Sequence, residues 1–157
     1  DFARALKDFD LAIGVDPKKW LAYYSKGEIY VEWKDYEQAI VNFSKSIEHN
    51  PGDVDSYFER GSIYIDIGDN QSALNDFNKV IELSPKNAAA YTNRGLIYLR
   101  LEEYQKSISD LSMAIKLDPS DGIAFGNRSL AYEGLGDIKK AELDKKISDQ
   151  LEKKRKP

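Results

Sequence analysis

The stretch VDSYFERGSIYIDIGDNQSALNDFNKVIELSPKN, residues 54–87, is followed by AAAYTNRGLIYLRLEEYQKSISDLSMAIKLDPSD, residues 88–121, and the two align without a gap. Both place a Tyr, a Gly, a second Tyr and a Pro at matching positions. The prolines carry this register outward along the chain at one constant interval: Pro17, Pro51, Pro85 and Pro119. A fixed period of this size indicates one structural unit repeated end to end.

The spacing inside a unit predicts two α-helices. Tyr23, Gly27 and Tyr30 recur at i, i+4 and i+7, which is one face of a helix. Ala39 and Phe43 stand at i and i+4 on a second segment. The proline at the end of each unit stops the second helix, because the residue before a proline avoids the helical region.

Acidic and amide residues stand where each predicted helix begins. Their side chains can accept hydrogen bonds from the free N–H groups of the first turn, so they are predicted helix caps. Those ahead of the second helix are Asp35, Asp69, Glu103 and Asp137, and those ahead of the first helix are Asp53, Asn87 and Asp121.

Composition limits the classes of function. The 157 residues are 41% hydrophobic and 32% charged with a net charge of −4, which predicts a folded chain and argues against nucleic acid or an anionic membrane as the main partner. The absence of cysteine excludes disulfides and thiolate metal sites. His49 is the only histidine and has no partner at a ligand or catalytic spacing. We therefore expect no cofactor, no metal, no membrane segment and no catalytic site.

These repeats resemble the tetratricopeptide repeat family, whose unit of about 34 residues runs aromatic, small residue, Tyr, Ala, Phe and Pro. Four registers across nearly the whole chain carry the resemblance, although Lys or Arg replaces the usual Leu before the small residue. The resemblance implies an all-α, right-handed superhelical solenoid of antiparallel helix pairs. The expected boundaries are a partial repeat at 1–19, repeats at 20–53, 54–87 and 88–121, and a last repeat with a polar capping helix at 122–157.

The resemblance also implies a non-catalytic protein–protein interaction module that binds a peptide or protein segment in a concave groove lined by the first helices. We expect Tyr24 and Phe58, large aromatics with no evident core role, to act as binding anchors. The full set of expected groove residues is Tyr24, Glu28, Asp55, Phe58, Ser62, Thr92, Asn93, Leu96, Arg100 and Asn127.

A carboxylate clamp for acidic chaperone tails is not expected. Such clamps need Lys, Asn and Arg at fixed groove positions, because a carboxylate is held by charge-assisted hydrogen bonds. The corresponding positions carry no cation in either frame: Phe58, Ser62, Asn93, Ile123 and Asn127, or Tyr24, Glu28, Glu59, Ala89 and Asn93.

Two further series repeat with the unit and admit two interpretations. Arg60, Arg94 and Arg128 form either a basic stripe for a partner or structural salt bridges, and the structural interpretation is favoured. The series Asn42, Asp76, Asp110 and Asp144 is likewise expected to be structural.

The two ends of the array differ. Residues 1–17 match only the second helix of a unit, so we expect an exposed apolar edge there that favours a homodimer. The start of the chain suggests a fragment of a longer protein, which leaves two alternatives open: a regulatory or targeting domain of a larger enzyme, or a self-associating scaffold.

Overall fold

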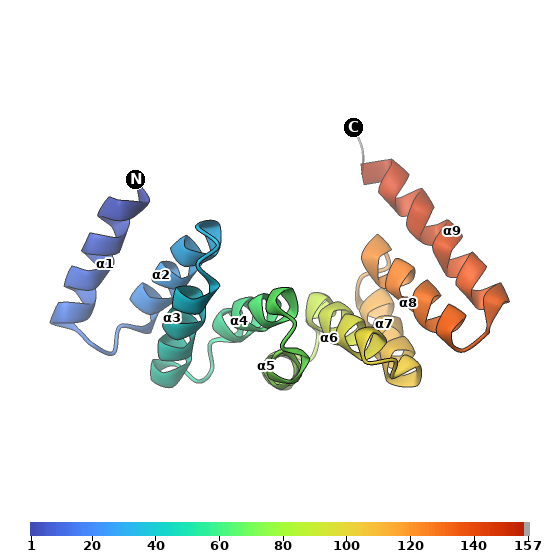
Figure 1. Cartoon of the computed structure of the whole chain (residues 1–157), viewed down its shortest axis with the longest axis horizontal. Helices are drawn as coiled ribbons and strands as arrows, with labels where there is room; N and C mark the ends of the chain where they lie inside the picture. The colour runs from blue at the N-terminus through green and yellow to red at the C-terminus, as the bar shows by residue number, and fades with distance from the viewer. Residues whose placement is uncertain (156–157) are drawn as a thin grey trace. The chain divides into compact units, whose positions relative to one another are not determined.

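The structure is a computed structural model that describes residues 1–155, and within that range it contains helices and no strands (Figure 1). The prediction of an all-α helical solenoid is confirmed. The helices are α1 (Phe2–Val15), α2 (Trp20–Glu32), α3 (Tyr36–His49), α4 (Val54–Ile67), α5 (Asn70–Leu83), α6 (Ala88–Arg100), α7 (Tyr104–Leu117), α8 (Gly122–Gly134) and α9 (Ile138–Arg155).

The chain divides into two compact units, with the boundary inside α5. The first unit is Asp1–Lys79 and the second begins at Val80. In the first unit α2 packs on α3, and α3 also contacts α4. In the second unit α6 packs on α7 and α8 on α9, while α7 contacts α8. The pairs α2–α3, α6–α7 and α8–α9 are pairs that the repeat predicts.

Small residues on the first helix of each pair make room for a large side chain of the second. A Cβ atom built on Gly27 would lie 2.7 Å from the ring of Phe43, and one on Gly95 would lie 2.7 Å from Leu111. Both of these large side chains are fully buried. The glycine lowers helix propensity by about 1 kcal/mol relative to alanine, and this close packing offsets that loss.

Most of the predicted caps are confirmed. The side chain of Asp35 accepts a hydrogen bond from the Gln38 backbone N–H at 3.1 Å, and Asn87 accepts one from Ala90 at 3.0 Å. Asp53 departs from the prediction, because its side chain makes no cap hydrogen bond. It is buried and accepts hydrogen bonds from the hydroxyls of Ser46 and Ser56 instead.

Glu103 also begins a helix without capping it, since its carboxylate pairs with Lys106 in the first turn. The turns between the helices of each pair share a left-handed residue. Lys34, Gly68, Glu102 and Gly136 all occupy this position of the repeat, with φ between 58° and 81°.

The repeated arginines are confirmed as structural. Arg60 forms two hydrogen bonds to the Asp76 carboxylate, 2.9 Å from Nε and 2.7 Å from Nη2, and its guanidinium lies over the rings of Tyr57 and Tyr64. The same bidentate pair joins Arg94 to Asp110 and Arg128 to Asp144. The aspartates are nearly buried, so each pair ties the two helices of its repeat together.

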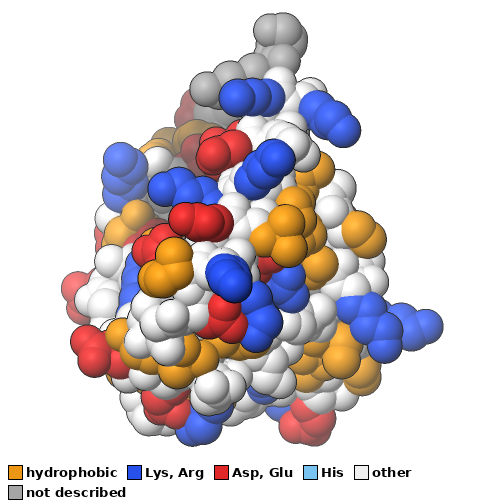
Figure 2. All heavy atoms as spheres, turned by 90° about the vertical axis from the view of Figure 1, so that its right-hand side faces the viewer, with side chains coloured by type: hydrophobic (Ala, Val, Ile, Leu, Met, Phe, Trp, Pro, Cys, Tyr) orange, Lys and Arg blue, Asp and Glu red, His pale blue; other side chains and the backbone are white. Residues whose placement is uncertain are grey.

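The end helices differ from the inner ones. No residue of α1 is buried, and Leu11 and Val15 are among its most exposed side chains. Among residues 138–154 of α9, only Ala141, Asp144 and Ser148 are buried. Figure 2 shows the end of the molecule that carries α9, where Lys, Arg, Asp and Glu side chains alternate with hydrophobic ones.

Candidate functional site

In the first unit, the expected binding residues lie on α2 and α4, but the two aromatic anchors have a role in the core. Tyr24 packs on the ring of Phe43 with centroids 5.6 Å apart, and Phe58 meets Phe77 edge-on at 5.5 Å. Both are half-buried. The prediction that these aromatics have no core role is wrong, because each reaches past the small residue of its own helix to the buried Phe of the next.

An acidic cluster lies beside Tyr24. Burial, followed by the charges of Glu28 and Asp55, raises the pKa of the Glu59 carboxyl above its ordinary value of 4.5. Burial and the neighbouring carboxylates, Glu28 first, also raise the pKa of the Tyr24 hydroxyl. None of Glu28, Asp55 and Glu59 pairs with a cation whose side chain the structure describes, in residues 1–154. We call Glu28, Asp55 and Glu59 the acidic cluster.

Glu59 was not among the expected binding residues, although the sequence analysis had placed it at a groove position in the test for a carboxylate clamp. Asn93 and Asn127, which were expected to line the groove, follow Glu59 by one and two complete repeats. The same repeat position therefore carries all three side chains. Ser62, also expected there, donates its hydroxyl to the Phe58 carbonyl at 2.9 Å and remains half-buried.

In the second unit, the expected residues differ in what they offer a ligand. Thr92 is buried and donates a hydrogen bond to the Asp121 carboxylate at 2.7 Å, which leaves its side chain little free surface. Asn93 and Leu96 are half-buried, and Arg100 is exposed. Their role in ligand binding stays a prediction.

Asn127 lines a cavity of about 390 Å³ between α8 and α9. Its side-chain Nδ2 is buried and has no hydrogen-bond partner in the structure. Gly122 and Gly126 lie on the same wall, and Lys145 lies opposite on α9. A buried amide donor without a partner can hydrogen-bond an incoming carbonyl oxygen at little cost, since its desolvation has already been incurred.

The histidine and the carboxylates form no metal site in the described part of the chain. His49 lies against the ring of Tyr23 with centroids 5.5 Å apart. Among residues 1–155, no group of three or more His, Asp or Glu side chains could hold a metal ion. None of the helices described in the structure is long and apolar enough to cross a bilayer.

Comparison with models of protein families identifies the family of the chain. A model described as "Tetratricopeptide repeat" matches residues 20–53 and 88–121, a second of the same description matches 42–75, and one described as "TPR repeat" matches 61–102. Together they cover the chain from 20 to 121. The chain belongs to the tetratricopeptide repeat family. It is accordingly a protein–protein interaction module, of a family whose members are typically non-catalytic.

Solved tetratricopeptide repeat structures share this fold along most of the chain. The crystal structure of MamA is 26% identical with a TM-score of 0.91, over 99% of this chain and 91% of that one. YrrB, described as a TPR protein with an unusual peptide-binding site, is 22% identical with a TM-score of 0.86, over 98% and 79%. No curated protein sequence matches the chain.

A third solved structure contains a peptide. The first TPR of Spaghetti (RPAP3), bound to the HSP90 peptide SRMEEVD, is 23% identical with a TM-score of 0.73, over 77% of this chain and 96% of that one. Its likeness to the present chain is a likeness of fold.

Proposed function

We propose that this tetratricopeptide repeat protein is a non-catalytic module that binds a peptide segment carrying a basic side chain on the exposed surface of its first helices. The acidic cluster carries the proposal. Three carboxylates without a cation, one of them partly withdrawn from water, form a site that a lysine or arginine of a ligand would stabilise. Tyr24 adds an aromatic ring beside the same site.

The proposed surface keeps every residue expected from the sequence and adds Glu59. In the first unit it comprises Tyr24, Glu28, Asp55, Phe58, Glu59 and Ser62. In the second unit it comprises Thr92, Asn93, Leu96, Arg100 and Asn127. We propose that Asn127 donates a hydrogen bond to a ligand carbonyl, because its Nδ2 has no partner in the described part of the chain.

An acidic chaperone tail is not the proposed ligand. The neighbour in complex with SRMEEVD binds an acidic sequence. In the present chain, the positions that would need cations hold neutral side chains, such as Tyr24, Phe58 and Ile123. The acidic cluster would repel such a tail.

The experiment is selection of short peptides from a random display library on the whole chain, followed by calorimetric titration of the selected peptides. We expect enrichment of Lys or Arg next to apolar residues. Asp55→Lys should weaken binding about tenfold or more, because it puts a like charge in the basic side chain's site. Glu48→Lys, the same charge reversal on an exposed residue of α3, is the matched control and should leave affinity unchanged.

Selection of acidic peptides, or titration that shows tight binding of SRMEEVD, would contradict the proposal. Tyr24→Ala and Phe58→Ala are poor tests, because both rings pack on the core and their loss would change stability together with binding.

The pH dependence of binding offers a second test. The folded-state pKa of Glu59 is raised, so the fold favours its protonated form, and a bound cation would favour the carboxylate. Affinity for a basic peptide should therefore fall as the pH is lowered through the raised pKa. Glu59→Gln should remove this part of the dependence. A profile identical in Glu59→Gln and in the unaltered chain would contradict the assignment.

A further inference from the structure

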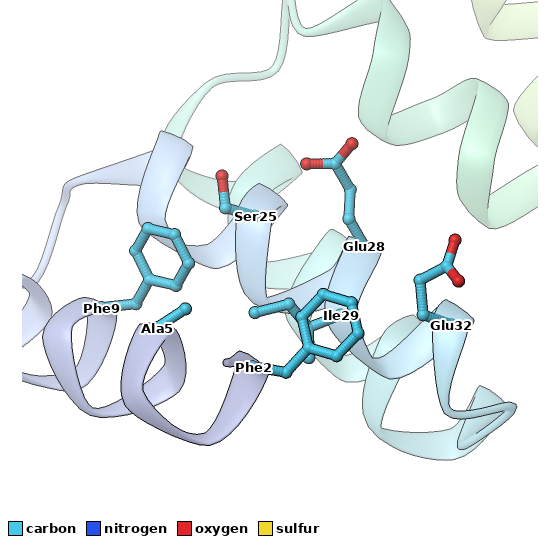
Figure 3. Close-up of a pocket in the computed structure, with 7 residues that line it drawn as sticks. All are labelled: Phe2, Ala5, Phe9, Ser25, Glu28, Ile29 and Glu32. Atoms are coloured by element: carbon cyan, nitrogen blue, oxygen red, sulfur yellow. The ribbon is translucent and has the colours of Figure 1, made fainter.

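An open cleft lies between α1 and α2. Glu28 of the acidic cluster is one of the residues that line it. One cavity of about 450 Å³ is lined by Phe2, Ala5 and Phe9 of α1 and by Ser25, Glu28, Ile29 and Glu32 of α2. A second of about 290 Å³ continues along the same helices and shares Phe9 and Ser25 with the first. Figure 3 shows the two phenylalanine side chains on the α1 side, with the carboxylates of Glu28 and Glu32 directed away from them.

The floor of this cleft repeats a surface that is covered elsewhere in the protein. Phe9 and Ala5 stand one complete repeat before Phe43 and Ala39, which are fully buried because α2 covers them. In α1 the same side chains are only half-buried and line open space. The cleft therefore has the shape that receives a first helix in the other repeats.

The chemistry of the occupant follows from the helices that fill the equivalent position. Gly27 contacts Phe43, Gly61 contacts Phe77 and Gly95 contacts Leu111, so the occupant needs a small residue opposite Phe9. In three repeats an arginine directly before the small residue pairs with an aspartate: Arg60 with Asp76, Arg94 with Asp110 and Arg128 with Asp144.

Asp8 occupies the same repeat position as those aspartates. It is exposed and forms no ion pair with any residue from 1 to 155. Glu28 and Glu32 add two further carboxylates at the rim of the cleft. Lys19 is the one cation among the residues that line the two cavities, and it lines the second together with Asp8. An apolar floor edged by three carboxylates and one lysine is on balance complementary to an amphipathic helix with basic residues beside its apolar face.

We propose that the α1–α2 cleft binds an amphipathic helix of a partner protein that presents a basic residue followed directly by Gly or Ser. Aromatic residues lie three positions before the basic residue and four positions after it, as Tyr57 and Tyr64 flank Arg60. The small residue packs on Phe9 and the basic residue pairs with Asp8. This site shares only Glu28 with the peptide surface proposed above.

The probe is a fluorescently labelled peptide with the sequence of residues 86–103, KNAAAYTNRGLIYLRLEE, which carries the pattern around Arg94 and Gly95. Titration with the whole chain, followed by fluorescence anisotropy, should show saturable binding. Phe9→Ala in the protein should weaken binding about tenfold or more, as expected for a central apolar contact. Leu11→Ala, on an exposed part of α1, is the matched control and should have no effect.

Two sets of substitutions test the small residue opposite Phe9 and the ion pair with Asp8. A peptide with Leu in place of its glycine should lose binding, because the side chain would overlap the Phe9 ring. Asp8→Arg should weaken the original peptide, and a peptide with Glu in place of its arginine should regain affinity for that variant. The probe also carries basic residues that suit the acidic cluster, so the titrations are repeated in the Asp55→Lys background, where the dependence on Phe9 and Asp8 should persist.

Several results would overturn the proposal. They are absence of binding, binding that Phe9→Ala does not weaken, and failure of the charge exchange at Asp8. Light scattering that shows a dimer disrupted by Phe9→Ala would assign the cleft to a second copy of the chain. If a longer form of the chain does not bind the peptide, the cleft would be assigned to the additional residues of that form.

Discussion

The helices α1 and α3 belong to the same unit and carry nearly the same pattern, yet they differ completely in burial. Ala39 and Phe43 of α3 are fully buried, whereas Ala5 and Phe9, at the same repeat positions in α1, line an open cleft. The difference comes from the neighbours, since α2 packs across α3 and no described helix takes that place on α1. In a repeat protein the sequence specifies which face is apolar, while burial depends on the adjacent element.

The strongest test of this comparison replaces the same aromatic in both helices. Phe43→Ala should lower the free energy of unfolding by about 3–5 kcal/mol, because it leaves a cavity beneath Gly27. Phe9→Ala should cost about 1 kcal/mol or less, since part of its ring is already in water. Urea denaturation followed by circular dichroism measures both. Equal losses would mean that α1 is covered in solution, against the structure.

A similar contrast applies to the acidic position before the aromatic. Asp76 is nearly buried against Arg60, so Asp76→Asn should destabilise the chain by about 2 kcal/mol by leaving the guanidinium without its charged partner. Asp8→Asn changes an exposed carboxylate and should stay within about 0.5 kcal/mol. Thermal unfolding of the two variants, compared at high and low salt, tests the difference. A large effect at Asp8 would show a partner that the structure lacks.

Glycine-to-alanine substitutions in α1 and at the interface of α2 with α3 should change the free energy of unfolding in opposite directions. A Cβ on Gly14 of α1 meets nothing within 4 Å, so Gly14→Ala should stabilise by about 0.5–1 kcal/mol through helix propensity. Gly27→Ala places a methyl group 2.7 Å from the Phe43 ring and should cost about 1 kcal/mol net. The readout is the urea midpoint of each variant. A stabilising Gly27→Ala would mean that the helix pair can separate without loss.

Much of this architecture could be predicted from the sequence, because the repeat presents the same apolar positions several times. The helix pairs and the structural role of Arg60 and its equivalents follow from that periodicity. The core role of Tyr24 and Phe58 could not be predicted from that periodicity. Each ring stands one residue outside the apolar positions that repeat, yet it is long enough to reach the next helix. The expected cap at Asp53 was also wrong, since two serines compete for its carboxylate.

The candidate site was harder to predict than the scaffold. The repeat position of Glu59 could be read from the sequence, but its part in an acidic cluster could not, because that depends on its burial and on its neighbours Glu28 and Asp55. The groove residues themselves stay a prediction. The residues that repeat define the fold. Ligand choice depends on residues that differ between repeats, and the repeat pattern does not tell which of these contact a ligand.

The smallest expected effect concerns the turn that precedes α3. Lys34 adopts φ 58° there, a left-handed conformation in which a side chain is strained by about 1 kcal/mol. Gly68 and Gly136 occupy the same repeat position without that strain. Lys34→Gly should therefore raise the unfolding free energy, by less than about 1 kcal/mol because glycine also gains entropy in the unfolded chain. Gly68→Ala, the reverse change at the equivalent turn, should lower it by about 1 kcal/mol. Paired thermal denaturation measures both, and a loss of stability in Lys34→Gly would show that the lysine side chain contributes more through its contacts than its backbone conformation costs.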